Sequence, residues 1–206
     1  MDSKWAAENL QTIRTLMERT AVYRRALAPT MLVSGGVGIA TALLGWLRGG
    51  DHPGGFVLLW LGAAIIALAG AMLVIRKQAL GAAEPFWTAP TRRIGQAVLP
   101  AFLAGAAVAV AGVLRPDRID LACLVGAWTL FYGIGLHAAA FFMQRGVRLF
   151  SWVLILSGIG LILARCGGGL HELDGKTACL WMGGIFGVSH LGYGIYLRLT
   201  ERSQSP

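Results

Sequence analysis

The chain has 206 residues, of which 56% are hydrophobic and only 14% charged, and its charges lie mainly between long apolar runs. That composition leaves too little polar surface for a soluble globule, and it predicts an all-α, polytopic integral membrane protein. The net charge of +8 accompanies no nucleic-acid-binding motif, so it indicates contact with the anionic lipids of a bilayer and excludes a nucleic-acid partner.

The first predicted element is an amphipathic cytoplasmic helix over residues 1–29. Within 5–27, apolar side chains recur at three- and four-residue steps, and charged side chains lie on the other faces. Pro29 is predicted to end this helix, because proline lacks an amide donor and disfavours helical geometry in the residue before it. Two roles stay open for the helix: attachment to lipid headgroups, or docking of a partner protein or a second copy of the chain.

Six apolar segments follow, each near the roughly 20 residues that a helix needs to cross a bilayer core. They form a predicted domain over 30–198, and a cytoplasmic tail over 199–206 ends the chain. Most links are short, so consecutive helices should be antiparallel neighbours, and we expect a bundle of three hairpins. The predicted spans are 30–47, 55–75, 96–114, 121–143, 149–165 and 177–197.

Basic residues are concentrated on one side of this topology. Of the 18 Lys and Arg residues, 13 lie in the terminal segments and the alternate links that share their side, and five lie in the other links. Basic residues stay on the cytoplasmic side during insertion, so both termini are predicted to be cytoplasmic. Fifteen Arg against three Lys, with abundant Ala and Gly, suit a bacterium with a GC-rich genome, and the predicted location is the bacterial inner membrane.

Three tryptophans lie at similar depth in the even-numbered spans. Trp60, Trp128 and Trp181 each follow an acidic residue of the preceding outward link by seven to nine positions. Tryptophan is enriched at membrane–water interfaces, so all three are predicted to anchor the outer interface.

Two of these tryptophans are followed nine residues later by a histidine, His137 and His190. At about 100° per residue, nine residues place the two side chains on opposite faces of a helix. If each tryptophan faces lipid, each histidine faces the bundle, where an ionisable side chain marks a candidate functional site. Tyr132 shares the span of His137, and Tyr193 shares the face of His190, so these four residues form the predicted ligand-binding set.

Three functions are compatible with this set. The first is binding or permeation of a small molecule, and the second is a non-catalytic sensor or scaffold subunit that engages a partner through the N-terminal helix. The third is a b-type haem electron carrier, with His137 and His190 as axial ligands and the propionates near Arg145, Arg148 or Arg198. A purely structural role for each imidazole, as a hydrogen-bond donor across a helix interface, also stays open.

No catalytic set is predicted. The run Ser189–Gly192 resembles a short segment of the rhomboid proteases, and the resemblance implies a serine nucleophile in an earlier span. The fourth span contains no serine, and Ser157 lacks the glycine two positions before the nucleophile. A serine protease needs an activated hydroxyl within reach of its base, so the sequence does not predict a protease.

The last outward link holds metal-binding side chain types and two flanking cysteines. His171, Glu172 and Asp174 are candidate metal ligands, but ligand type alone does not fix a coordination geometry, and a solvated loop is the preferred interpretation. Cys166 and Cys179 flank this link, where an oxidising compartment would permit a disulfide. Two thiols that never meet are the alternative.

Overall fold

The computed structural model describes residues 3–48, 52–81, 83, 87, 89–143 and 145–202, with side chains described for 26–48, 52–81, 83, 87, 91–143 and 145–200. Every regular element in these ranges is helical. Six helices are long and apolar enough to cross a membrane, which confirms an all-α fold with six potential spans. These spans are Ala26–Arg48, Pro53–Gly81, Thr91–Leu114, Leu121–Phe142, Arg145–Cys166 and Gly175–Thr200.

The sixth span is built from three successive helical elements, whereas each of the first five consists of one α-helix, with a short 3-10 extension in the fourth. The elements are α1 (Ser3–Arg48), α2 (Pro53–Gly81), α3 (Ala89–Leu114), η1 (Pro116–Arg118), α4 (Leu121–Ala139), η2 (Ala140–Phe142), α5 (Arg145–Cys166), α6 (Gly175–Met182), η3 (Gly183–Val188) and α7 (Ser189–Arg202).

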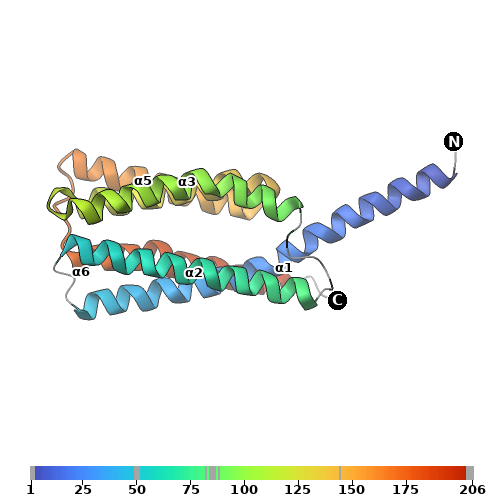
Figure 1. The fold of residues 1–206 in the computed structure, drawn as a ribbon, viewed down its shortest axis with the longest axis horizontal. Coiled ribbons are helices and arrows are strands. Elements are labelled where there is room, and N and C mark those ends of the chain that lie inside the picture. The colour runs from blue at the N-terminus through green and yellow to red at the C-terminus, as the bar shows by residue number, and fades with distance from the viewer. Residues whose placement is uncertain are drawn as a thin grey trace.

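The first helix continues through Pro29, so the predicted helix end at this proline is wrong. The three residues before Pro29 are buried: Ala26, Leu27 and Ala28. Their packing keeps the helix continuous although proline cannot donate one of its backbone hydrogen bonds. Figure 1 shows the N-terminal part of α1 projecting beyond the bundle. The predicted apolar stripe over 5–27 falls mostly on side chains that lie outside the described set.

The bundle consists of two groups of three spans (Figure 1). α1 packs against α2 and against α6, η3 and α7, and these elements form the α1 group. α4 packs against both α3 and α5, and these helices form the α4 group. The fifth and sixth spans therefore belong to different groups. The predicted arrangement as three hairpins is not confirmed, because the sixth span packs mainly on the first.

Glycine allows the closest helix contacts inside each group. In the α4 group, a Cβ atom at Gly158 of α5 would lie 2.6 Å from the backbone nitrogen of Leu130 in α4. In the α1 group, a Cβ atom at Gly38 would lie 2.9 Å from the Cα atom of Gly187 in η3. Lipid provides no hydrophobic drive for helices to associate, so close backbone packing of this kind stabilises each group.

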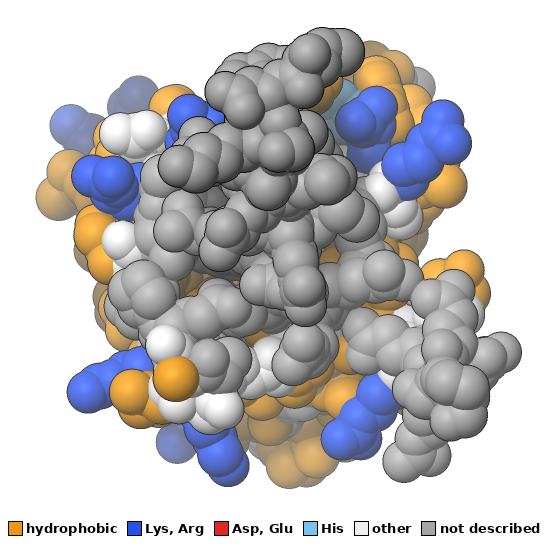
Figure 2. Space-filling model, turned by 90° about the vertical axis from the view of Figure 1, so that its right-hand side faces the viewer, with side chains coloured by type: hydrophobic (Ala, Val, Ile, Leu, Met, Phe, Trp, Pro, Cys, Tyr) orange, Lys and Arg blue, Asp and Glu red, His pale blue; other side chains and the backbone are white. Residues whose placement is uncertain are grey.

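The end of the bundle that carries both termini is basic, and Figure 2 shows Lys and Arg side chains around its rim. We name it the basic end. The exposed basic side chains there are Arg76, Lys77, Arg92, Arg93, Arg145, Arg148 and Arg198. The four acidic side chains that the structure describes all lie near the opposite end: Asp117, Asp120, Glu172 and Asp174.

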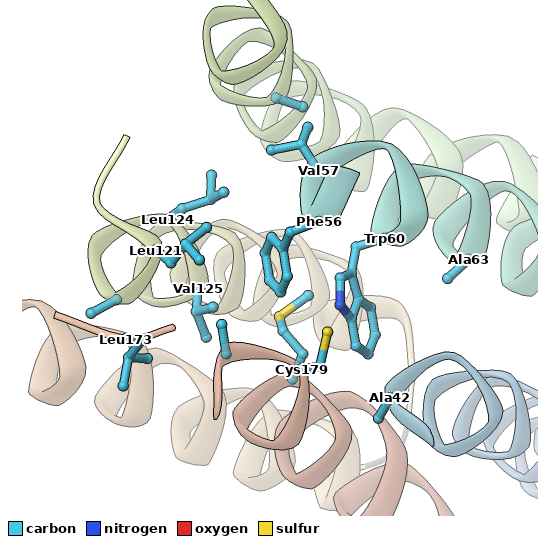
Figure 3. Close-up of a cluster of buried hydrophobic side chains, with 14 of the residues drawn as sticks. Ala42, Phe56, Val57, Trp60, Ala63, Leu121, Leu124, Val125, Leu173 and Cys179 are labelled. Carbon is cyan, nitrogen blue, oxygen red and sulfur yellow. The ribbon is translucent and has the colours of Figure 1, made fainter. Parts of the chain in front are cut away.

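An apolar core fills the bundle near the end opposite the basic end (Figure 3). Phe56 and Trp60 of α2 lie in one cluster with Val125 of α4 and Cys179 of α6, and all four side chains are buried. This half of the interface between the two groups is therefore closely packed and apolar. The buried polar side chains that join the two groups lie nearer the basic end.

Candidate functional site

His190 is 1% exposed, and its Nε2 atom lies 2.9 Å from Oη of Tyr132. His190 lies ten residues before Thr200 and Tyr132 ten residues before Phe142, which are the basic-end limits of their spans. At 1.5 Å per residue the pair is about 15 Å from those limits, near the middle of a bilayer core about 30 Å thick. Because Tyr132 belongs to α4 and His190 to α7, this hydrogen bond joins the α4 group to the α1 group.

The donor in this hydrogen bond follows from the other contacts of the imidazole. The Nδ1 atom of His190 lies 3.4 Å from Oγ of Ser189. The Ser189 hydroxyl donates its one proton to the carbonyl of Ile185, so it can only accept from the imidazole. Nδ1 of His190 therefore carries the proton. Nε2 is then the acceptor, and the Tyr132 hydroxyl donates to a neutral imidazole.

The segment that leads into Ser189 and His190 is a π-helix, η3, whose sequence is GGIFGV. A π-helix uses i→i+5 hydrogen bonds, and such segments are frequent at functional sites. Glycine lets this turn pack directly on α1, since a Cβ atom at Gly187 would lie 3.0 Å from the backbone nitrogen of Ile39. The glycine-rich sequence before His190 therefore lets this turn lie close to α1.

Aromatic rings surround the buried pair. Phe150 of α5 meets the His190 ring edge-on at a centroid distance of 5.0 Å, and it stacks on Tyr193 at 4.9 Å. Phe186 packs edge-on against Tyr132 at 5.2 Å. We name Tyr132, Phe150, Phe186, His190 and Tyr193 the His190 cluster. The Tyr193 hydroxyl is buried and has no hydrogen-bond partner among the described residues.

The structure brings three of the four predicted ligand-binding residues into this cluster and leaves His137 outside it. His137 is half-buried, and its Nδ1 atom lies 3.1 Å from Oγ of Ser151. Ser151 donates its one hydroxyl proton to the carbonyl of Arg148 at 2.7 Å, so His137 must donate to Ser151. That bond joins α4 to α5 within one group and matches the structural role that the sequence left open.

Sequence reasoning did not identify Phe150 and Phe186. A signal for Phe186 exists, because it precedes His190 by four residues and so shares its helix face. Phe150 lies on a different helix, and its position depends on how α5 packs, which no spacing in the sequence reveals.

A b-type haem does not fit these residues. Axial ligation by both histidines requires two imidazoles that face each other across the haem plane with a free nitrogen each. The Nε2 atom of His190 is already bonded to Tyr132, and two aromatic rings pack against the imidazole. His137 is directed to Ser151 and packs edge-on against Trp152 at 5.2 Å. The histidines therefore belong to separate environments, and we derive no redox chemistry from them.

Of the three tryptophans predicted to anchor the outer interface, Trp60 and Trp128 have packing partners inside the bundle, and their interfacial role stays a prediction. Trp60 is 5% exposed and belongs to the apolar core. Trp128 stacks on Phe56 at a centroid distance of 6.2 Å, and its Nε1 donates to the carbonyl of Gly105 at 3.0 Å. This backbone carbonyl satisfies the indole N–H of Trp128. Trp181 is 43% exposed, and its interfacial role stays a prediction.

The predicted metal ligands of the outward link have other roles or are solvated. His171 and Glu172 are exposed. The carboxylate of Asp174 accepts a hydrogen bond from the Thr177 amide at 2.9 Å and caps α6, and its bonds to Thr177 lower the pKa of Asp174. Within the described part of the chain, no group of three or more His, Cys, Asp or Glu side chains could hold a metal ion.

Cys166 and Cys179, for which the sequence left a disulfide open, are both free thiols in the structure, as is Cys123. Cys179 is 1% exposed and points toward α1, because a Cβ atom at Gly45 would lie within van der Waals overlap of its Sγ atom. Cys166 is exposed at the end of α5. The two thiols therefore face different surroundings.

Comparison with known protein families, curated proteins and solved structures gives no match for this chain. The chemistry of the His190 cluster must therefore be judged from its geometry. The cluster offers a neutral imidazole, two phenol hydroxyls and aromatic faces. Such groups bind and orient a molecule by hydrogen bonding and stacking.

Proposed function

We propose that this chain is a multi-pass protein of the bacterial inner membrane that binds a small neutral molecule at the His190 cluster. The observation that carries the proposal is the Tyr193 hydroxyl, which is buried without a partner beside the neutral Tyr132–His190 pair. A buried hydroxyl left unpaired costs about 1–3 kcal/mol. A bound molecule that accepts a hydrogen bond from Tyr193 would recover that free energy.

The cluster also indicates the chemical class of this molecule. None of its five members is charged, and the described parts of the spans contain no Asp or Glu side chain beside it. A charged ligand would lose its hydration without gaining a partner charge. Four phenyl or phenol rings favour a flat apolar body, and Tyr193 favours one hydrogen-bond acceptor on it. Sites of this composition occur between the helices of bundles.

Phenol is a suitable probe, because it combines an aromatic ring with one oxygen acceptor, and toluene is its matched control without the acceptor. We expect phenol to raise the melting temperature of the protein in lipid nanodiscs more than toluene does. Tyr193→Phe should abolish that difference. Tyr196→Phe removes the same hydroxyl from a side chain that is 58% exposed, three residues along the same helix, and should preserve it. An equal phenol response in both variants contradicts the proposal.

The charge distribution supports a cytoplasmic location for both termini. Seven exposed basic side chains gather at the basic end, whereas the described acidic side chains lie near the opposite end. Basic residues flanking spans favour the cytoplasmic side. A C-terminal green fluorescent protein fusion in bacteria should therefore be fluorescent, and a C-terminal alkaline phosphatase fusion inactive. A non-fluorescent first fusion together with an active phosphatase fusion would place the C-terminus on the outer side and contradict the proposed orientation.

A sensor or scaffold subunit is the second candidate function, and the projecting part of α1 favours it. The helix begins at Ser3 and extends beyond the bundle (Figure 1), where it is accessible to a partner protein or to a second copy of the chain. Deleting residues 2–24 should then abolish co-purification of that partner, and Tyr193→Phe should leave co-purification intact. If the same proteins co-purify with and without the segment, it is not a docking helix.

A further inference from the structure

The contact between α4 and α5 has a regular register that leads to a pair of cysteines. Along the interface between the two helices, which we name the seam, contacts recur every three or four residues in each helix, which is one helical turn. The contacting pairs are His137 with Ser151, Gly133 with Ile155, Leu130 with Gly158, and Gly126 with Ile162. One further turn reaches Cys123 on α4 and the end of α5 at Arg165 and Cys166.

A polar contact fixes both helix ends beside these cysteines. The Asp120 carboxylate accepts from the Cys123 amide at 3.0 Å and caps α4. Its other oxygen accepts from Nε of Arg165 at 2.5 Å, one residue before Cys166. Partial burial raises the pKa of Asp120, but the bonds from Cys123 and Arg165 outweigh it and hold the pKa below its usual value. Asp120 therefore stays anionic at neutral pH and joins the two helix ends.

The backbone around Cys166 allows the small movement that a bond would need. Cys166 is the last residue of α5 and is followed by three glycines, of which Gly168 has a φ of +77°. Cys123 is half-buried and Cys166 exposed, so a reagent in water reaches Cys166 first. A disulfide needs Cα atoms about 4.4–6.8 Å apart, a separation that closely packed helices with small residues in their seam can provide.

We propose that Cys123 and Cys166 form a disulfide that links the outer ends of α4 and α5, with a low-molecular-weight or protein disulfide as the oxidant. The Cys166 thiolate attacks one sulfur of the oxidant, forms a mixed disulfide and releases one thiol. The Cys123 thiolate then attacks the Cys166 sulfur, closes the intramolecular bond and releases the second thiol. The two cysteines lose two protons and two electrons, and the oxidant gains both.

The test is oxidation of the purified full-length protein in nanodiscs with oxidised glutathione, followed by alkylation and peptide mapping without reductant. We expect peptides joined through Cys123 and Cys166, with Cys179 alkylated only after unfolding. Cys179→Ser should retain the linkage, and Cys123→Ser should lose it. Dithiothreitol should separate the peptides and lower the melting temperature, because a disulfide restricts the unfolded chain.

Three results would overturn the proposal. One is a linkage between Cys166 and Cys179, another is a linkage between two copies of the chain, and the third is full alkylation of Cys123 and Cys166 after oxidation. Peptide mapping of the oxidised protein without any substitution identifies the linked cysteines directly, so the test does not depend on how well a variant folds. The result is also independent of the phenol response, which concerns the His190 cluster.

Discussion

Replacing Tyr132 by phenylalanine tests whether the hydrogen bond between the two helix groups stabilises the bundle. The substitution removes one oxygen and keeps the ring that packs edge-on against Phe186 and stacks on Phe102. It therefore leaves the shape of the site intact. The only change at His190 is that its Nε2 atom loses the donor 2.9 Å away.

The size of the effect follows from burial and from the membrane setting. An acceptor left unpaired in a protein interior costs about 1–3 kcal/mol. Hydrogen bonds between membrane helices contribute less, about 0.6 kcal/mol on average and up to about 1.7 kcal/mol, because the unfolded chain in the membrane also finds partners. His190 is 1% exposed, so water cannot replace the lost donor, and we expect a loss in the upper part of the range for membrane helices, about 1–1.7 kcal/mol.

The assay is unfolding in mixed micelles of mild detergent and dodecyl sulfate, with the free energy of unfolding extrapolated to zero dodecyl sulfate. A double-mutant cycle of Tyr132→Phe with His190→Leu isolates the pairwise term, which we expect at about 1 kcal/mol. Tyr196→Phe is the control, because its side chain is 58% exposed. The reasoning is refuted if the coupling is zero, or if both tyrosine variants lose equal stability.

Three further predictions concern packing and charge, and each is checked by the same unfolding assay. Gly158→Ala should destabilise the bundle by about 1–3 kcal/mol, because its new methyl group meets the backbone of α4, whereas Gly160→Ala, with nothing within 4 Å, should have little effect. Gly187→Ala should likewise destabilise the contact of η3 with α1 and abolish the phenol response, and Gly184→Ala should do neither. Asp120 has a folded-state pKa below the ordinary aspartate value of 3.8, so its stabilisation is present above that pH and is lost as the pH falls through the folded-state pKa. Asp120→Asn should therefore lower the free energy of unfolding at pH 7 and make that free energy fall less on acidification. An unchanged dependence on acidic pH would contradict the Asp120 prediction. Equal losses of stability in a glycine variant and its control would contradict the glycine predictions.

The half-turn relation between each tryptophan and its histidine shows what the sequence could predict. Nine residues do place the two side chains on opposite faces, so one faces the bundle interior when the other faces outward. In the sixth span Trp181 is exposed and His190 is buried, so the two residues of that pair do differ in this way. In the fourth span both side chains are half-buried: Trp128 packs on Phe56, and His137 forms a hydrogen bond with Ser151 of α5, so neither residue alone faces the interior. Helical geometry fixed the relation, but only packing decided which residue faced inward.

The grouping of the spans was equally inaccessible to sequence reasoning. Span length and hydropathy depend on local composition, so six spans could be predicted from the apolar runs. Which helices are neighbours depends on contacts between distant segments, such as Gly38 of α1 with Gly187 of η3. The abundance of glycine in these spans indicated close packing. The glycine content did not indicate that the sixth span would pack on the first. Without knowing which helices are neighbours, Phe150 could not be assigned to the site.

The position of the His190 cluster determines how a molecule would reach it. Near the end opposite the basic end, Phe56, Trp60 and Cys179 fill the bundle with apolar side chains. Toward the basic end, the contact between the groups includes the Tyr132–His190 bond and the stacked rings of Phe150 and Tyr193. Entry near the basic end would break one hydrogen bond and separate stacked rings, and a bound ligand could hydrogen-bond and stack with the groups exposed in this way. Entry through the apolar core would instead open a cavity that offers the ligand no hydrogen-bond partner. We therefore expect a ligand of this site to enter from the side of the basic end.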